Sequence, residues 1–350
     1  MAVEGAPSSS RDEWPSRVRG VDWIEDVRVY EIPMTTRFRG ITARRGMVLK
    51  SPLGWVEWSP FEEYAPAEAL RWWQAAEAAA TSGFPEPVRE AVPVNLTVPA
   101  EAPEQAHARV GASSCTTAKV KVADPGQGLA EDVARVEAVR DALGPDGRLR
   151  VDANGAWTPS QALAAIGELR RFGLEYVEQP CRTVEELARL RRELARRGWD
   201  VLIAADESIR RAGDPERVVE LEAADLAVVK VQPLSGVRAC LDLVERLGLP
   251  VVVSSALETS IGLRAGVALA AALPELPFAC GLNTSALLTG DLVTEPLRER
   301  GGVIGVGDLD VDGSALERWA ADDRVTGRWM ERLDQVLALV DVENREGARR

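Results

Sequence analysis

The sequence predicts an α/β fold, a closed (β/α) barrel of the TIM type preceded by a smaller α+β region. Between residues 92 and 305, eight short apolar runs alternate with stretches rich in Ala, Leu, Arg and Glu. This is the pattern of parallel strands joined by crossover helices. Residues 22–58 instead contain short alternating runs separated by Gly and Pro, as antiparallel strands do. A third observation is the regular spacing of charged residues through the barrel region.

These charged residues follow the apolar runs at intervals of about one barrel unit. They are Lys121, Asp152, Glu178, Asp206 and Lys230, and the steps between them are 31, 26, 28 and 24 residues. One strand, one helix and two short loops need about that length. Each charged residue lies near the C-terminal end of a predicted strand, which is where barrel enzymes place their active sites.

The first 91 residues are expected to form a separate N-terminal domain. Strands are predicted at 26–34, 42–51 and 54–60, and an amphipathic helix at 65–80. The barrel domain is expected to span residues 92–305, and residues 306–350 are expected to pack back against the N-terminal domain as part of a cap.

Local patterns predict each element of the barrel. The strands are expected at 92–98, 118–122, 148–153, 174–179, 201–207, 226–231, 250–256 and 278–284, and helices at 128–144, 158–173, 183–198, 214–224 and 235–248. Thr158 stands directly before a proline, a combination that caps helix starts. Gly173, Gly198 and Gly248 follow the ends of three helices, where a left-handed residue stops the helix.

The composition indicates a cytoplasmic, soluble protein. The chain has 42 Lys and Arg against 55 Asp and Glu, and no isolated basic run, so neither nucleic acid nor an anionic membrane is an expected partner. No stretch approaches the ~20 apolar residues of a membrane span, and the first 20 residues lack the apolar segment of a signal peptide. The four cysteines have no CxxC spacing, which favours reduced thiols. No obligate protein partner is evident.

Three carboxylates are candidates for a metal site. Asp152, Glu178 and Asp206 belong to successive strands, so their side chains are expected to converge above the barrel. Carboxylates in contact repel one another, and a divalent cation relieves this repulsion. All-oxygen ligation favours Mg²⁺ over zinc, with Mn²⁺ as a substitute. The structural alternative is that each acid pairs with an arginine at the barrel rim.

Two lysines flank the three carboxylates in the strand order. Lys121 precedes them and Lys230 follows them, and strand alternation places Lys119 on the same face as Lys121. Burying a lysine in an apolar strand costs free energy unless its charge is paired or has a function. The two lysines could simply neutralise the acids. Desolvation and neighbouring cations favour the neutral amine, which can act as a base. The only histidine, His107, lies outside the strand ends and is expected at the surface.

The motifs KVK, VDANGAW, EQP, ADES, VKVQP and SSALETSIG, in this order, resemble those of the enolase superfamily, in its muconate-lactonising-enzyme-like subgroup. Within that subgroup the chain most resembles the o-succinylbenzoate synthase family of menaquinone biosynthesis. The resemblance covers nearly the whole chain. It implies a modified (β/α)₇β barrel with an α+β capping domain formed by the N-terminal segment and the C-terminal tail.

The resemblance also implies roles for individual residues. Asp152, Glu178 and Asp206 would bind Mg²⁺, Lys121 would be the general base, and Lys230 would stabilise an enediolate. Supporting residues would touch the substrate carboxylate, orient the metal site or line the substrate pocket. They are Lys119, Asn154, Glu207, Ser254, Ser255, Gly281, Asn283 and Thr284.

The implied reaction is a syn elimination of water from 2-succinyl-6-hydroxy-2,4-cyclohexadiene-1-carboxylate, a small-molecule carboxylate, to give 2-succinylbenzoate. Lys121 would act first as base and then, as its conjugate acid, on the departing hydroxyl. The same pair of lysines also serves N-succinylamino acid racemases and dipeptide epimerases. Dipeptide epimerases usually carry an acidic pair after the last strand, where this chain has Asn283, and the nearest acid is Asp291.

Two other classes of function stay open on the sequence. A Schiff-base aldolase could use Lys121 or Lys230, and a non-catalytic barrel could serve interactions. The loop of residues 34–46 is strongly basic. Arg37 or Arg39 in this loop could meet the succinyl carboxylate of the substrate by a bidentate contact, although exposed loop arginines are more often solvated.

Overall fold

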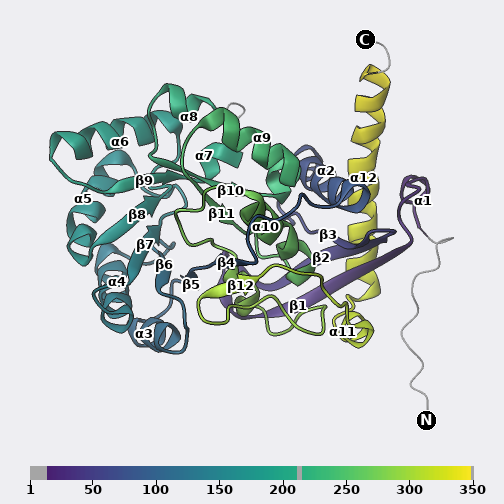
Figure 1. Ribbon diagram of the computed structural model, residues 1–350, viewed down its shortest axis with the longest axis horizontal. Helices are drawn as coiled ribbons and strands as arrows, with labels where there is room; N and C mark the ends of the chain where they lie inside the picture. The colour runs from purple at the N-terminus through teal and green to yellow at the C-terminus, as the bar shows by residue number, and fades with distance from the viewer. Residues whose placement is uncertain (1–13, 211–214, 348–350) are drawn as a thin grey trace.

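The computed structural model describes residues 14–210 and 215–347, and a curled parallel sheet forms its larger part (Figure 1). Seven strands lie in the order β11-β10-β9-β8-β7-β6-β5, and each neighbouring pair is parallel. They are β5 (Leu96–Val98), β6 (Thr117–Lys121), β7 (Arg148–Asp152), β8 (Leu174–Glu178), β9 (Leu202–Ala205), β10 (Leu226–Lys230) and β11 (Val251–Ser254). The predicted barrel-type α/β fold is confirmed.

The predicted eighth strand is reduced to two single bridges that close the curled sheet. Cys280 pairs with Val94 on one side, and Gly281 pairs with Ser254 on the other, both in parallel. Leu282 then leaves the extended conformation, with φ −105° and ψ 0°. Strand pairing therefore stops after Gly281, and the chain enters a 3₁₀ helix.

The predicted first strand is divided into two. β4 (Ala91–Pro93) pairs antiparallel with β12 (Val303–Gly305), and only β5 joins the barrel. Between them, the Asn95 amide donates to the carbonyl of Cys280. Pro93 has no N–H to offer a continuous ladder, which fits the break at this point.

Helices follow the barrel strands, and most of them cover the outer face of the sheet (Figure 1). They are α3 (Pro103–Gly111), α4 (Leu129–Leu143), α5 (Pro159–Leu169), α6 (Val184–Arg196), α7 (Glu207–Arg210), α8 (Arg217–Glu220), α9 (Val237–Leu247) and α10 (Ser260–Ala272), with 3₁₀ helices η2 (Arg170–Phe172), η3 (Gln232–Leu234) and η4 (Asn283–Leu287). Thr158 caps α5, since its side chain accepts from the Gln161 amide. The predicted stops at Gly173, Gly198 and Gly248 all have left-handed φ values.

The helix predicted at 214–224 is shorter than expected. Residue 214 lies outside the described residues, and of the remainder only α8 is helical. Glu222 has a φ of +50°, which ends helical geometry two residues after α8. The single turn α7, by contrast, was not predicted, and it begins at Glu207, the last residue of the predicted strand 201–207.

The N-terminal cap is an antiparallel sheet packed against helices. Its strands lie in the order β1 (Asp26–Phe38), β2 (Ile41–Ser51) and β3 (Gly54–Trp58). Its helices are α1 (Ser16–Arg19), α2 (Pro66–Ser82), α11 (Gly313–Arg318) and α12 (Asp323–Gly347). The ring of Trp58 meets that of Trp329 edge to face, with centroids 5.5 Å apart. Figure 1 shows α12 standing beside the cap sheet. The domain boundaries at 91/92 and 305/306 stay predictions.

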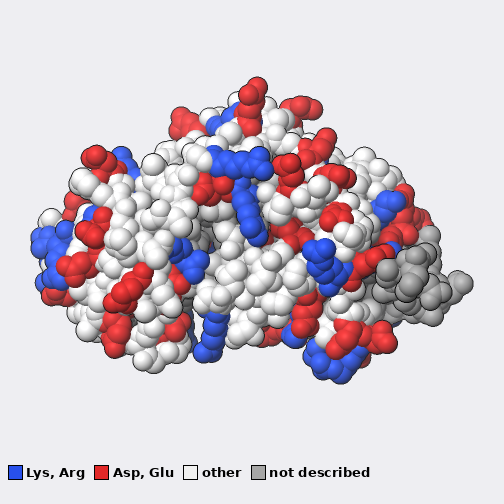
Figure 2. Space-filling model, turned by 90° about the horizontal axis from the view of Figure 1, so that it is seen from below, with Lys and Arg blue, Asp and Glu red and all other residues white. Residues whose placement is uncertain are grey.

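The surface charges, the histidine and the cysteines can be compared with what the composition predicts. Figure 2 shows acidic and basic side chains interspersed on one face, without an extended basic area. His107 is exposed on α3, and its Nε2 lies 3.1 Å from Asp141. The four cysteines are buried and unpaired. Among the described helices, none is long and apolar enough to cross a membrane.

Candidate active site

The C-terminal ends of neighbouring strands meet at one edge of the sheet. In the strand register Lys121 pairs with Asp152, and Asp152 pairs with Glu178. Asp206 follows directly after β9, and Lys230 ends β10. The structure therefore brings together at one edge the five charged residues whose spacing was noted in the sequence.

The two flanking lysines each hold one of the outer carboxylates. Lys121 Nζ lies 2.5 Å from Asp152 Oδ2, and Lys230 Nζ lies 2.6 Å from Asp206 Oδ2. Glu178 stands on β8, between the strands that end in these two pairs. The lysines consequently approach the carboxylate group from its two ends.

Lys119 points to the same side of β6 as Lys121 and is more deeply buried. Its Nζ lies 2.7 Å from one carboxylate oxygen of Glu178 and 2.8 Å from the other. Val120 alternates with these lysines and lies in the apolar core of the barrel, as the period of a strand requires. Burial disfavours the charge of Lys119, but Glu178 and Asp152 outweigh it and raise the pKa of the ammonium.

The three carboxyl groups differ in their tendency to ionise. Burial alone would raise the pKa of Asp152 and Asp206, but Lys121 beside the first and Lys230 beside the second hold both pKa values well below the usual range. Glu178 behaves differently. Burial and the negative charge of Asp152 raise the pKa of Glu178 from 4.5 to about 7. The centre of the group is thus the place where negative charge is least well compensated.

Arg210 on α7 braces the Asp206 side of the site. Its Nε lies 3.1 Å from Asp206 Oδ1, its Nη2 lies 2.6 Å from Glu207 Oε1, and its Nη1 lies 3.3 Å from the hydroxyl of Tyr64 in the cap. Burial opposes the charge of Arg210, but Asp206 raises the pKa of the guanidinium. Sequence reasoning missed Arg210. Its spacing of three and four residues from the two acids is the signal of a helical ion pair.

Two residues next to the carboxylates have left-handed backbones. Asn154 has φ +47° and Gln179 has φ +37°. Asn154 Oδ1 accepts from Lys121 Nζ at 2.7 Å, and its Nδ2 lies 3.4 Å from Glu207 Oε1. Gln179 Oε1 accepts from the Asp206 amide at 2.9 Å. Gln179 was not assigned a role from sequence, although it follows Glu178 in EQP. Sparsely populated backbone conformations cluster at functional sites.

The predicted pocket residues after β11 contact one another. Ser254 lies level with Lys230 in the strand register. The Ser255 hydroxyl lies 2.6 Å from that of Thr284 and donates to the carbonyl of Gly281 at 3.0 Å. A Cβ atom on Gly281 would lie 2.5 Å from the Ser254 hydroxyl oxygen. A larger residue at position 281 would therefore displace the Ser254 hydroxyl.

Asn283 and Asp291 are engaged by the backbone. Asn283 is buried in η4, and its Oδ1 accepts from the Glu299 amide at 3.2 Å. Asp291 is also buried, and it accepts from the amide and hydroxyl of Ser260 and from the Leu292 amide. Asp291 is the first acid after Asn283 in the sequence, and these hydrogen bonds already engage its carboxylate.

The hairpin between β1 and β2 reaches the base side of the site. The ring centroid of Phe38 lies 5.4 Å from Lys121 Nζ. Arg39 donates from Nη2 to the Tyr64 hydroxyl at 2.8 Å, so its guanidinium is already engaged within the cap. Arg37 is exposed. Contact of either arginine with a substrate carboxylate stays a prediction.

The donor set suits a hard divalent cation, although it is not preassembled. Among the described residues, no group of three or more His, Cys, Asp or Glu stands ready to hold a metal ion, and each of the three carboxylates is turned to a lysine. All their donor atoms are carboxylate oxygens, which Mg²⁺ prefers. Glu207 Oε2 is buried without a hydrogen-bond partner, and Glu178 is poorly compensated. Both observations fit a site that gains from an added cation.

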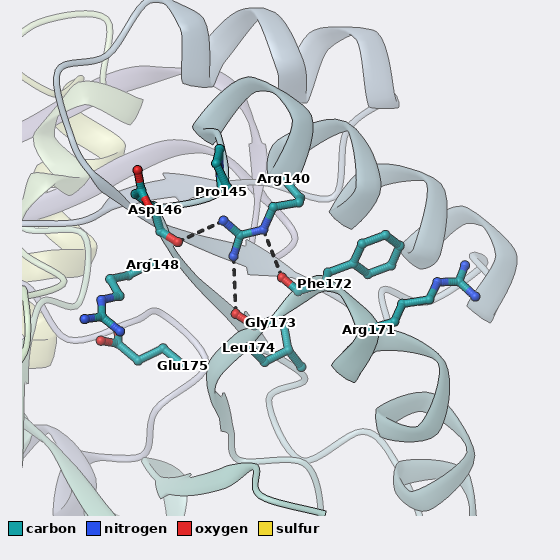
Figure 3. Close-up of a pocket in the computed structure, with 10 residues that line it drawn as sticks. Arg140, Pro145, Asp146, Arg148, Arg171, Phe172, Gly173, Leu174 and Glu175 are labelled. Carbon is teal, nitrogen blue, oxygen red and sulfur yellow. Dashed lines mark hydrogen bonds between the residues drawn. The ribbon is translucent and has the colours of Figure 1, made fainter.

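A separate hollow of about 400 Å³ lies at the opposite end of the barrel. It is bordered by residues that precede β7 and β8. Figure 3 shows Arg140 directing its guanidinium to the backbone carbonyls of Phe172 and Gly173, at 2.9 and 3.2 Å. Arg140 also donates to the carbonyls of Gly144 and Gly147. This arginine therefore holds two loops together, far from the carboxylates at the C-terminal strand ends.

Two family models and several curated proteins match this sequence. The family described as enolase C-terminal domain-like matches residues 101–310, and the enolase N-terminal domain-like family matches residues 29–80. A protein of Thermobifida fusca named o-succinylbenzoate synthase is 57% identical over 319 residues, which cover 91% of this chain and 98% of that one. A protein of Mycolicibacterium smegmatis with the same name is 46% identical over 321 residues, covering 91% and 97%.

Solved structures share the fold at low sequence identity. An N-succinyl Arg/Lys racemase from Bacillus cereus has a TM-score of 0.72 at 18% identity, covering 85% of this chain and 97% of that one. Muconate lactonizing enzyme from Pseudomonas putida has a TM-score of 0.70 at 20% identity, covering 85% and 100%. The solved structures show the fold, whereas the relatives at 57% and 46% identity show the family. The chain belongs to the enolase superfamily and, within it, to the o-succinylbenzoate synthase family.

Proposed function

We propose that this protein is an o-succinylbenzoate synthase that dehydrates 2-succinyl-6-hydroxy-2,4-cyclohexadiene-1-carboxylate to 2-succinylbenzoate in menaquinone biosynthesis. The relative of that name, 57% identical over 98% of its length, supports the reaction. One feature of the site carries the mechanism. A lysine stands at each end of a group of three buried carboxylates.

Lys121 is proposed to move the proton in both halves of the reaction. As the neutral amine it takes the proton from the ring carbon that bears the carboxylate, and the electron pair left behind forms an enediolate. That electron pair then expels the hydroxyl group on the adjacent ring carbon. The hydroxyl takes the same proton from the Lys121 ammonium and leaves as water. One residue can serve both steps because proton and hydroxyl leave from the same face.

The other charged residues are proposed to hold the substrate and its developing charge. Lys230 stands at the opposite end and stabilises the enediolate by its positive charge. Lys119 touches the substrate carboxylate while keeping Glu178 oriented. Before catalysis Lys121 must leave Asp152, whose oxygen it contacts at 2.5 Å. Asn154 Oδ1, at 2.7 Å, stays available to orient the amine.

Asp152, Glu178 and Asp206 are the proposed ligands of Mg²⁺, with Mn²⁺ as a substitute. A bound divalent cation would supply positive charge beside the substrate carboxylate. Arg210 and Asn154 keep Glu207 and the ligands in place, as residues surrounding a metal site do. Ser255, Thr284 and their neighbours are proposed to line the substrate pocket.

A cytoplasmic location is part of the proposal. The four unpaired, buried cysteines fit a reducing compartment. The proposed partner is the small dicarboxylate substrate alone.

The decisive experiment compares two activities on one preparation. Dehydration is followed by formation of the aromatic product, and racemisation of an N-succinylamino acid is followed by loss of optical rotation, both with Mg²⁺. We expect kcat/KM to be higher for dehydration, because the sequence relatives carry that name and proton exchange between two lysines is not needed for it. A higher kcat/KM for racemisation would assign the racemase function instead.

Two controls separate the remaining classes. Borohydride added with substrate should not label the enzyme, because the proposed chemistry forms no Schiff base. Labelling of Lys121 or Lys230 would assign the aldolase class. If neither substrate is turned over with Mg²⁺, the remaining interpretation is a non-catalytic barrel that serves interactions.

A further inference from the structure

The segment that joins β11 to α10 is held in an unfavourable conformation. Leu257 has φ +64°, a left-handed value that bulky residues rarely adopt, and the residue is 3% exposed. Such a conformation costs on the order of 1–3 kcal/mol and persists only where the surroundings impose it. Ser255, two residues earlier, carries the hydroxyl that contacts Thr284. Something must therefore hold this segment in place.

Arg44 of the cap holds the carbonyls of this segment. It lies on β2 and is 2% exposed. Its Nε donates to the Leu257 carbonyl at 3.0 Å, and its Nη2 lies 3.4 Å from the Ala256 carbonyl. The same Nη2 also donates to the carbonyl and hydroxyl oxygens of Ser59. The guanidinium holds its donors in a rigid planar fork that spans two successive peptide units, whereas a lysine ammonium is a compact group on a flexible stem.

Glu57 of the cap holds the other end of the same segment, at the start of α10. Its Oε2 accepts from the Thr259 amide at 3.1 Å, the Thr259 hydroxyl at 2.5 Å and the Gly262 amide at 3.1 Å. A negative group at a helix N-terminus is stabilising. A Cβ on Gly262 would lie 3.0 Å from the Glu57 carboxyl carbon. Glycine at this position thus permits the close approach.

We propose that Arg44 and Glu57 are positioning residues that set the substrate-binding geometry of Ser255 through the segment 256–262. The inference rests on the proposed function for its substrate and on the contacts above for its geometry. Arg44 donates to the carbonyls that precede Glu258, and Glu57 accepts from the amides that follow it at the start of α10. The capping domain thereby shapes a pocket wall that the barrel supplies, without either residue touching the reacting atoms.

The test uses two conservative variants, Arg44→Lys and Glu57→Gln. Arg44→Lys keeps the charge but loses the rigid planar fork of donors, and Glu57→Gln replaces acceptor capacity with an amide donor. With Mg²⁺ and substrate, we expect KM to rise at least about tenfold while kcat stays within about threefold, because binding geometry is lost and Lys121 is untouched. Thermal unfolding of each variant establishes that it is folded.

Arg140→Lys is the matched control. Arg140 also holds backbone carbonyls of two loops, but at the opposite end of the barrel. Its replacement should lower the melting temperature comparably and leave KM within about twofold. An equal rise in KM for Arg140→Lys would overturn the proposal, because general destabilisation would then account for the effect.

Hydrogen exchange supplies a readout that needs no substrate. The amides of Thr259 and Gly262 donate to Glu57, so peptides covering residues 255–262 should exchange at least about tenfold faster in Glu57→Gln and in Arg44→Lys, and unchanged in Arg140→Lys. Unchanged exchange in that segment, or an unchanged KM in the two folded variants, would refute the positioning role. If the wild-type protein lacks dehydration altogether, the proposed function fails while the exchange result still decides whether the cap holds the segment.

Discussion

Replacing Glu258 with Gln should make the stability of the protein less dependent on pH. Glu258 is 1% exposed. Its Oε2 accepts from the Ala256 amide at 2.7 Å, but its Oε1 is buried without a partner. Burial, and then the nearby charge of Glu57, raise the pKa of Glu258 from 4.5 to about 7, while Arg44 opposes them. The folded protein therefore holds a proton on Glu258 at pH values where the unfolded chain does not.

The sign and size of the effect follow from proton linkage. Between pH 4.5 and 7 the folded state binds more protons than the unfolded state, so the free energy of unfolding falls as pH rises through this window. Above pH 7 the full cost of the buried charge is present. One pKa unit corresponds to about 1.4 kcal/mol, so the stability contribution of Glu258 changes by about 2–3 kcal/mol between pH 5 and pH 8.

The assay is urea unfolding of wild type and Glu258→Gln at pH 5, 6, 7 and 8. Groups that titrate alike in both proteins cancel in the difference between their unfolding free energies. This difference should move in favour of the variant by about 2–3 kcal/mol from pH 5 to pH 8. Glu258→Asp at the same pH values is the matched control, because it keeps a titratable carboxyl group in the segment.

A difference that stays constant within about 0.5 kcal/mol across these pH values would refute the reasoning. Glu258 would then ionise in the folded protein as it does in water. A shift in the opposite direction would mean that the carboxylate, rather than the acid, is the form stabilised by Arg44.

Three further predictions concern the site. Lys121→Ala should lower kcat for dehydration by at least about 10²-fold, while calorimetry shows Mg²⁺ binding nearly intact; a wild-type kcat would contradict its role. Lys230→Ala should lower kcat with little change in KM, because Lys230 is proposed to act on the enediolate; a change in KM alone would place it in ground-state binding. EDTA should abolish turnover, and Mg²⁺ or Mn²⁺ should restore it; full activity after EDTA would exclude the metal.

The parts of the site that follow strand periodicity could be predicted from the chain alone. Lys119 and Lys121 alternate with Val120, so their common face follows from the pleat of a strand. The intervals between Lys121, Asp152 and Glu178 place them at matching ends of consecutive parallel strands. The structure has these residues level in the register, because each βα unit repeats the same geometry.

Other parts depend on contacts between distant segments. Arg210 contacts Tyr64 of the cap, and no local pattern links positions so far apart. The predicted strand at 278–284 shrank to two bridges because Leu282 turns out of the extended conformation, although its apolar pattern resembles that of a strand. The single turn α7 was likewise not predicted, because it directly follows an apolar run that has the pattern of a strand.

The sequence by itself determined the order of the strands, the side of the barrel that carries charge and the chemical types that meet there. Those features arise from repeats within one strand or one βα unit, which are short-range. The tertiary structure alone decided how the cap engages the barrel. Arg44 and Glu57 lie about 200 residues before the segment that they hold. The left-handed backbone at Leu257 could not be predicted from local sequence either, because bulky residues rarely adopt it and Arg44, which contacts the Leu257 carbonyl, comes from a distant part of the chain.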